Sequence, residues 1–236
     1  GANDAAVLSV DSPSVFCAGM EDIYATIANF GSNQLDSVMV NWEFNGVAQP
    51  SINYTTLIDT LNSTAGNTAS LFLGTKMFTA GTSNDIKVWT SMPNGVADTS
   101  NFNDTITVIK GASLVGGAYT IDPNIAPSAT NFISFADLSV AFSSFGICGP
   151  VTVDVAPGVY FESLNLSNVV GTNSTNTITI DGGDSSTTLL SHDGTVNFGA
   201  VSIEGTDYVT IRNMSIEHTG SSGAAVITAN ANHISI

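Results

Sequence analysis

A short strand motif recurs in the last third of this chain and constrains its fold more than any other feature. Apolar–polar–apolar triplets return at spacings of 27, 31 and 25 residues. One repeat of this length cannot bury an apolar face by itself, so neighbouring repeats must stack. The spacing predicts a parallel β-helix over residues 151–236, with the triplets as stacked strands. The triplets begin at Val151, Ile178, Val209 and Ile234.

The chain ends inside one of these expected coils. The last triplet occupies residues 234–236, which are also the last three residues. A solenoid needs a polar cap over its open end. We therefore expect a truncated β-helix that continues into further domains of the same polypeptide, with an apolar edge at residues 233–236.

An amphipathic helix is predicted immediately before the first coil. Apolar residues recur at helical spacing from Phe135 to Phe145. Ser134 is a suitable N-cap, and Gly146 can end the helix. We expect this helix to cover the N-terminal end of the β-helix.

The first half of the chain has the pattern of an immunoglobulin-like sandwich. Seven short strand-like runs are separated by turn residues. The clearest run alternates Val38, Val40 and Trp42 with polar residues, and we expect Trp42 to meet Trp89 in the core. The runs cover residues 6–10, 23–29, 37–44, 51–56, 69–73, 86–90 and 105–108. The prediction is an all-β chain: a sandwich over 1–110, a linker over 111–118, and the capped start of a β-helix over 119–236.

The charge balance excludes one class of partner. Twenty acidic residues face four basic ones, and the net charge is -16. Nucleic-acid binding needs clustered Lys and Arg, so we exclude it. No apolar run is long enough to span a membrane. Ca²⁺ is the one cofactor that the sequence leaves open.

Two groups of oxygen-bearing side chains are candidates for Ca²⁺, which prefers carboxylate and amide oxygens. Neither matches the twelve-residue loop of an EF-hand, and each can equally be a hydrogen-bonded turn. The candidates are Asp98, Asn101, Asn103 and Asp104 in the first domain, and Asp181 and Asp184 in the second.

The two cysteines, Cys17 and Cys148, share no metal-binding spacing. They either form a disulfide that links the two domains, as export would allow, or remain buried free thiols. The isolated position of each cysteine in the sequence favours free thiols.

The β-helix segment offers little for catalysis. Polysaccharide lyases need a strong base beside carboxylates, and this segment holds one arginine, Arg212, and no lysine. We expect Arg212 to lie near Glu204, Asp207, Glu217 and His218 as scattered surface charges. No catalytic residue is predicted.

The chain resembles two kinds of module found in large secreted proteins of Bacteroidota. Its first part is similar to adhesion modules of the CARDB type, and its second part to the start of right-handed β-helix domains. The first resemblance rests on Phe16-Cys17-Ala-Gly19, Ile27-Ala-Asn29-Phe-Gly31, Val40-Asn-Trp42 and Val88-Trp89-Thr90. The second rests on Gly146-Ile-Cys148-Gly-Pro150, Pro157-Gly158-Val-Tyr160 and Ile178-Thr-Ile180-Asp-Gly-Gly183.

The resemblance implies an extracellular or cell-surface glycoprotein, exported by type IX secretion and serving as an attachment or gliding-motility adhesin. It also implies O-glycosylation at Ser37, Thr60 and Thr105, each of which follows an aspartate. We therefore predict a noncatalytic adhesin segment for attachment or display. Its expected partners are further domains of the same polypeptide, surface polysaccharide or another extracellular molecule. The alternative is an accessory part of a polysaccharide lyase or hydrolase whose catalytic coils lie beyond residue 236.

Overall fold

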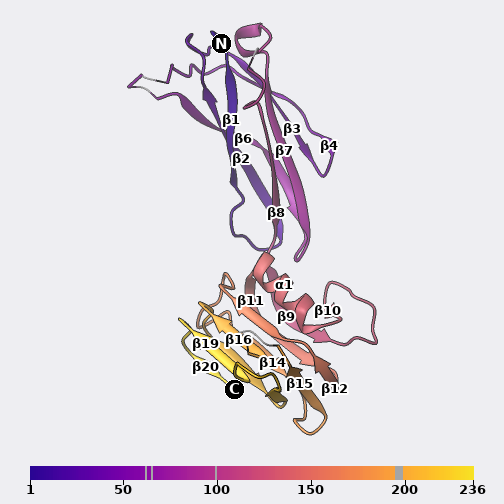
Figure 1. Ribbon diagram of the computed structural model, residues 1–236. Coiled ribbons are helices and arrows are strands. Elements are labelled where there is room, and N and C mark those ends of the chain that lie inside the picture. Colours follow the sequence, from indigo (N-terminus) through magenta and orange to yellow (C-terminus); the bar gives the residue numbers. More distant parts are fainter. Residues whose placement is uncertain (62, 65, 99, 195–198) are drawn as a thin grey trace. The chain divides into compact units, whose positions relative to one another are not determined.

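The chain folds into two compact units. The computed structural model describes residues 1–236 except 62, 65, 99 and 195–198 (Figure 1). Unit 1 comprises Gly1–Ser14 and Gly19–Gly111, and unit 2 comprises Val15–Ala18 and Ala112–Ile236. A short piece of the connection between the first two strands thus belongs to unit 2.

Unit 1 is an antiparallel immunoglobulin-like sandwich of two sheets. One sheet has the order β1-β2-β6, and the other has the order β4-β3-β7-β8, with β5 also paired to β3. All seven predicted strands are present, and the structure adds the two-residue β4. The strands are β1 (Ala5–Ser12), β2 (Gly19–Asn29), β3 (Val38–Phe44), β4 (Val47–Ala48), β5 (Ile52–Tyr54), β6 (Thr68–Phe78), β7 (Ser83–Ser91) and β8 (Thr105–Gly111).

Strand alternation decides which tryptophan enters the core of unit 1. Trp42 is 2% exposed and lies against Gly74 of β6, where a Cβ would stand 2.9 Å from its ring. On β7 the buried positions are the even-numbered ones, including Val88. Trp89 therefore faces the other way. The predicted contact between Trp42 and Trp89 in the core is wrong for this reason.

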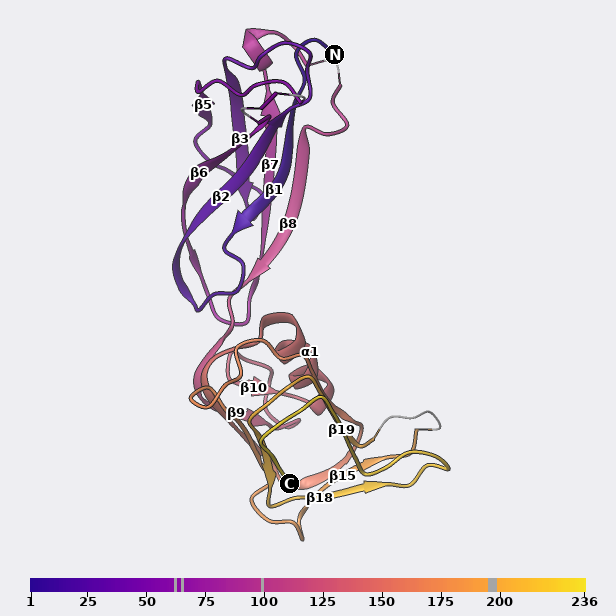
Figure 2. The same cartoon turned by 90° about the vertical axis from the view of Figure 1, so that its left-hand side faces the viewer.

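Unit 2 contains three parallel sheets that the chain visits in turn. From β11 onward every third strand returns to the same sheet, so each of these strands pairs with one a full coil away. The first sheet holds β9 (Leu114–Ile121), β10 (Asn131–Phe132), β11 (Ile147–Val155), β14 (Ile178–Asp181), β17 (Val209–Arg212) and β20 (Ile234–Ser235). The second holds β12 (Gly158–Phe161), β15 (Thr188–His192) and β18 (Ser215–His218), and the third holds β13 (Leu164–Ser167), β16 (Val201–Glu204) and β19 (Val226–Ala229). Figure 2 shows these sheets as the sides of one coil.

The triplets stack as their spacing predicts. Val151 pairs with Ile178, Ile178 with Val209, and Val209 with Ile234. The inward residues of these strands form one apolar core with those of the other two sheets. In the last coil, Ile234 is only partly buried against this core.

The helix α1 (Phe135–Phe145) has the predicted bounds. The Asp137 amide donates to the Ser134 hydroxyl at 3.0 Å, and Gly146 ends the helix with a φ of 66°. The buried face of the helix packs against β9 and β13 and joins the core of unit 2.

The predicted linker over 111–118 differs from the structure, because β9 begins at Leu114 and pairs with β11. Gly116 serves a close strand approach rather than a loop. A Cβ on Gly116 would lie 3.1 Å from the Gly149 Cα on the neighbouring strand.

Candidate functional site

One end of unit 1 brings together the first group of predicted calcium ligands. Asp98, Asn101, Asn103 and Asp104 all lie on the segment between the short helix η1 (Pro93–Gly95) and β8. The Asp98 carboxylate accepts from the Ala5 amide at 2.9 Å and from the Ser100 amide at 2.8 Å. The bond from Ala5 attaches the segment to the start of β1.

Asp4 joins this group, although the sequence analysis missed it. Asp4 is 5% exposed, and its Oδ1 accepts from the Asn103 amide nitrogen at 3.0 Å. The residue is about a hundred positions from Asp104 in sequence, so no local pattern could have paired them. The sandwich places the two together because β1 contacts β8.

Asp104 has the least satisfied carboxylate of the group. Its Oδ1 is buried without a hydrogen-bond partner, as is the Oδ1 of Asn103. Burial, together with the nearby negative charges of Asp98 and Asp4, raises the pKa of Asp104 to about 6. A cation at this point would stabilise the ionised carboxylate.

The side-chain amide of Asn101 closes the cluster. One of its terminal atoms lies 3.3 Å from the Asp104 Oδ2 and 2.9 Å from the Asp98 carbonyl oxygen. Both neighbours are acceptors. Either the amide nitrogen stands there and donates to both, or the amide oxygen stands there and three oxygens converge as they do around a cation.

The cluster therefore offers a mixed set of oxygen ligands rather than a ring of carboxylates. Within the described residues, no group of three or more His, Cys, Asp or Glu is arranged to hold a metal ion. Ca²⁺ also accepts amide and carbonyl oxygens and water, which this site can supply. The cluster opens into a surface hollow of about 400 Å³ lined in part by Trp89 and Met92.

The second predicted group, Asp181 and Asp184, consists of carboxylates that accept hydrogen bonds within turns. Asp181 accepts from the Asn213 amide at 2.9 Å and the Gly183 amide at 2.9 Å, which lower its pKa. Asp184 accepts from the Ser186 amide at 2.8 Å, and this bond lowers its pKa. None of these bonds joins the two carboxylates.

Arg212 has an ion-pair partner that the sequence did not predict. Its Nε donates to Asp181 at 2.8 Å, across the register between β14 and β17. Glu204 belongs to the third sheet and Glu217 to the second, and Arg212 forms its ion pair with Asp181 rather than with either of them. A side chain can meet its ladder neighbour more easily than residues on other sheets of the coil.

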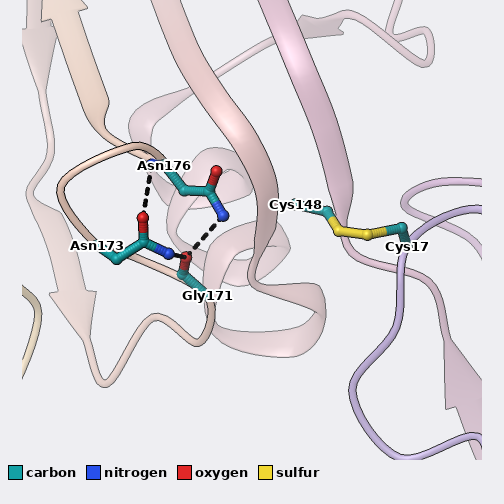
Figure 3. Close-up of a disulfide and its surroundings, with 5 residues drawn as sticks. All are labelled: Cys17, Cys148, Gly171, Asn173 and Asn176. Carbon is teal, nitrogen blue, oxygen red and sulfur yellow. Dashed lines mark hydrogen bonds between the residues drawn. A yellow bond between two sulfur atoms is a disulfide. The ribbon is translucent and has the colours of Figure 1, made fainter.

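The two cysteines form a disulfide within unit 2 (Figure 3). The Cα atoms of Cys17 and Cys148 are 5.5 Å apart, as in an ordinary disulfide. The bridged segment is also held by the Ser113 amide, which donates to the Phe16 carbonyl at 2.9 Å. The favoured alternative of free thiols is therefore wrong.

Next to Cys148, Asn173 and Asn176 bond to the Gly171 carbonyl, each at 3.2 Å.

The three candidate glycosylation positions differ in access. Ser37 and Thr60 are half-buried, and the Thr60 amide donates to Asp59. Thr105 is exposed at the start of β8. Access to a modifying enzyme is therefore best at Thr105.

A scan against family models and a search of curated proteins found no match. Among solved structures, the chain is similar to the CARDB domain of a Pyrococcus furiosus protein in complex with di-metal ions. That match has 17% identity and a TM-score of 0.36, and it covers 46% of this chain and 87% of that one. A domain of a Methanosarcina acetivorans protein named as a cell surface protein matches with 19% identity and a TM-score of 0.39, over 47% and 92% of the two chains. In the described part of the chain, no helix has the length and apolarity needed to cross a membrane.

Proposed function

We propose that this chain is a noncatalytic, extracellular or cell-surface segment that serves in attachment or display. The observation that carries the proposal is the Cys17–Cys148 disulfide. Disulfides form and persist in oxidising, exported environments and are rare where glutathione keeps thiols reduced. A net charge of -16 and a surface rich in Thr, Ser and Asn suit a chain that works in solution outside the cell.

In this proposal, unit 2 is the start of a right-handed parallel β-helix. Three parallel sheets visited in rotation, with ladders that run through every coil, support this assignment. Such a solenoid is a stiff support whose faces repeat along its axis. Further domains of the same polypeptide would be its first partners, and surface polysaccharide or another extracellular molecule would be the target of attachment.

The location is tested on protein in its native cells. Intact cells are treated with a membrane-impermeant biotin reagent, and free thiols are trapped with acid and an alkylating agent before reduction. We expect biotinylated protein whose Cys17 and Cys148 peptides are joined. Recovery of both cysteines as alkylated thiols in unlabelled protein would refute the proposal.

The same cells test the wider origin suggested by the sequence resemblance. In a Bacteroidota host with type IX secretion, disrupting that secretion route should remove the labelled protein from the surface. The intact mass of the native protein should exceed the sequence mass if Thr105 is O-glycosylated, and a Thr105→Ala variant should lose the excess. An unmodified mass would remove the glycosylation part of the proposal.

A second role, structural Ca²⁺ binding, is favoured by the buried and unpartnered Asp104 Oδ1. Asp104, Asn101 and the Asp98 carbonyl oxygen would hold the ion, which would supply the positive charge that this cluster lacks. Thermal melting of the full chain with Ca²⁺ or with EGTA tests the role. We expect a higher melting temperature with Ca²⁺ in the native chain but not in Asp104→Asn, and equal values in the native chain would refute it.

A further inference from the structure

The outer face of the β1-β2-β6 sheet carries exposed apolar side chains in a regular pattern. Met20 pairs with Met77, and Tyr24 pairs with Phe72. These four side chains are 61%, 62%, 39% and 46% exposed, respectively. Alternation places them on the side of the sheet away from the sandwich core, because Ile23 and Ala25, which flank Tyr24 on β2, are buried. Exposed apolar groups gathered on one face mark interaction surfaces.

Polar rows separate and flank the apolar ones. Asp22 lies between the two apolar rows, and its Oδ1 accepts from the Thr75 hydroxyl at 2.6 Å. On the far side, the Thr26 hydroxyl donates to Asp11 at 2.7 Å. Each carboxylate keeps further lone pairs for a partner. The face therefore presents apolar anchors together with negative charge.

The edge of this sheet is also open at β6. Among the described residues, β2 is the one strand neighbour of β6, which is 11 residues long. The opposite edge differs, because the Val7 amide of β1 donates to the Asn103 carbonyl at 3.2 Å. A long open edge is a template for another strand unless charged side chains guard it.

The single charge on β6 does not guard this edge. The Lys76 ammonium lies 5.5 Å from the Trp42 ring centroid and bonds to the Gln49 side chain, so it is held over the sandwich interior. Lys76 thus serves packing within unit 1. Both the backbone edge and the outer face beside it remain available.

We propose that β6 accepts an extended segment of another protein as a fourth strand of this sheet. The rows define the segment: apolar residues beside Met77 and Phe72, and a Lys or Arg between them that reaches toward Asp22. Strand addition supplies backbone hydrogen bonds, and the alternating side chains supply specificity. Aromatic residues and Met are also the apolar types enriched at protein interfaces.

Two other occupants fit the face less well. A second copy of this chain brings no cation to the outer face of the sheet, and two chains of net charge -16 repel each other. A sugar ring stacks on a flat aromatic surface, whereas the Tyr24 and Phe72 rings are inclined by 52° to each other at a centroid distance of 5.4 Å. The proposed interface depends only on the structure of unit 1, and it does not depend on whether the chain is extracellular.

The test uses the full chain and a fluorescent synthetic peptide of the length of β6. The peptide carries Leu, Lys and Leu at the positions that would lie on the outer face of the sheet, with Thr between them. We expect saturable binding by anisotropy, and binding about tenfold weaker when the peptide Lys is replaced by Glu. Phe72→Ser and Met77→Ser should weaken binding, whereas the control Phe102→Ser, at a residue 89% exposed and outside this sheet, should not. Unchanged melting temperatures verify that the variants are folded.

Peptides with N-methyl groups along one edge provide a measurement that needs no variant of the protein. Methylation of the edge that faces β6 should abolish binding, while methylation of the other edge should leave it intact. The proposal is overturned by absence of saturable binding, by indifference to N-methylation, or by equal loss with Phe102→Ser. It is also overturned if the chain dimerises through Phe72, or if neutral oligosaccharides displace the peptide.

Discussion

Removing the Cys17–Cys148 disulfide should destabilise unit 2, and the number of residues in the loop that the disulfide closes sets the expected loss of stability. The cysteines are 131 residues apart, and the loop-closure relation gives about 5 kcal/mol for a fully flexible loop of that length. If unit 1 stays folded while unit 2 unfolds, the flexible part is mainly residues 112–148. A loop of about 40 residues gives ~4 kcal/mol by the same relation.

The assay is urea unfolding of the double variant Cys17→Ser/Cys148→Ser against the oxidised native chain, followed by far-UV circular dichroism. For a unit of this size, a loss of 4 kcal/mol corresponds to a fall of about 10–15 °C in melting temperature. The reduced native chain is the matched control, since it lacks the bond but keeps both sulfur atoms. It should unfold with the double variant.

Hydrogen exchange locates the effect. The Ser113 amide, which donates to Phe16, should exchange much faster once the Val15–Ala18 segment is released. The Leu114 amide, which donates to Gly146 at 3.1 Å, should change less and serves as the internal reference. A double variant within about 1 kcal/mol of the oxidised chain, with Ser113 still protected, would refute the reasoning.

Three further predictions concern single positions. Gly74→Ala should cost about 2 kcal/mol in urea unfolding, because its Cβ would stand 2.9 Å from the buried Trp42 ring; an unchanged midpoint would show that the ring has room to move. In EGTA, the raised pKa of Asp104, about 6 against 3.8, favours the folded state below pH 4, and this stability is lost as the pH rises through 6. The loss should be about 2 kcal/mol after solvent screening, and Asp104→Asn should abolish this pH dependence of the unfolding free energy. Asp181→Asn should lower the free energy of unfolding by about 1 kcal/mol, because it weakens the contact with Arg212 and the turn bond from the Gly183 amide. Arg212→Gln should lower the free energy of unfolding by no more than this if the turn bonds dominate.

Local patterns in the sequence predicted most of the secondary structure. The alternation around Trp42 and the triplets from Val151 onward are properties of adjacent residues, and they identify strands without knowledge of partners. The helix bounds followed from Ser134 and Gly146 in the same way. The glycines near 116 were misread, because a glycine in a loop and a glycine at a close strand contact look alike in sequence.

The sequence by itself determined the strands, the helix and the repeat that sets the coil length, because each depends on backbone geometry over a few residues. Only the tertiary structure decided which distant groups meet: Cys17 with Cys148, Asp4 with the Asp98 segment, and Arg212 with Asp181. Only strand order left β6 at an edge of its sheet. Such contacts depend on how whole sheets pair, and that choice is made by the summed burial of many side chains rather than by any one segment.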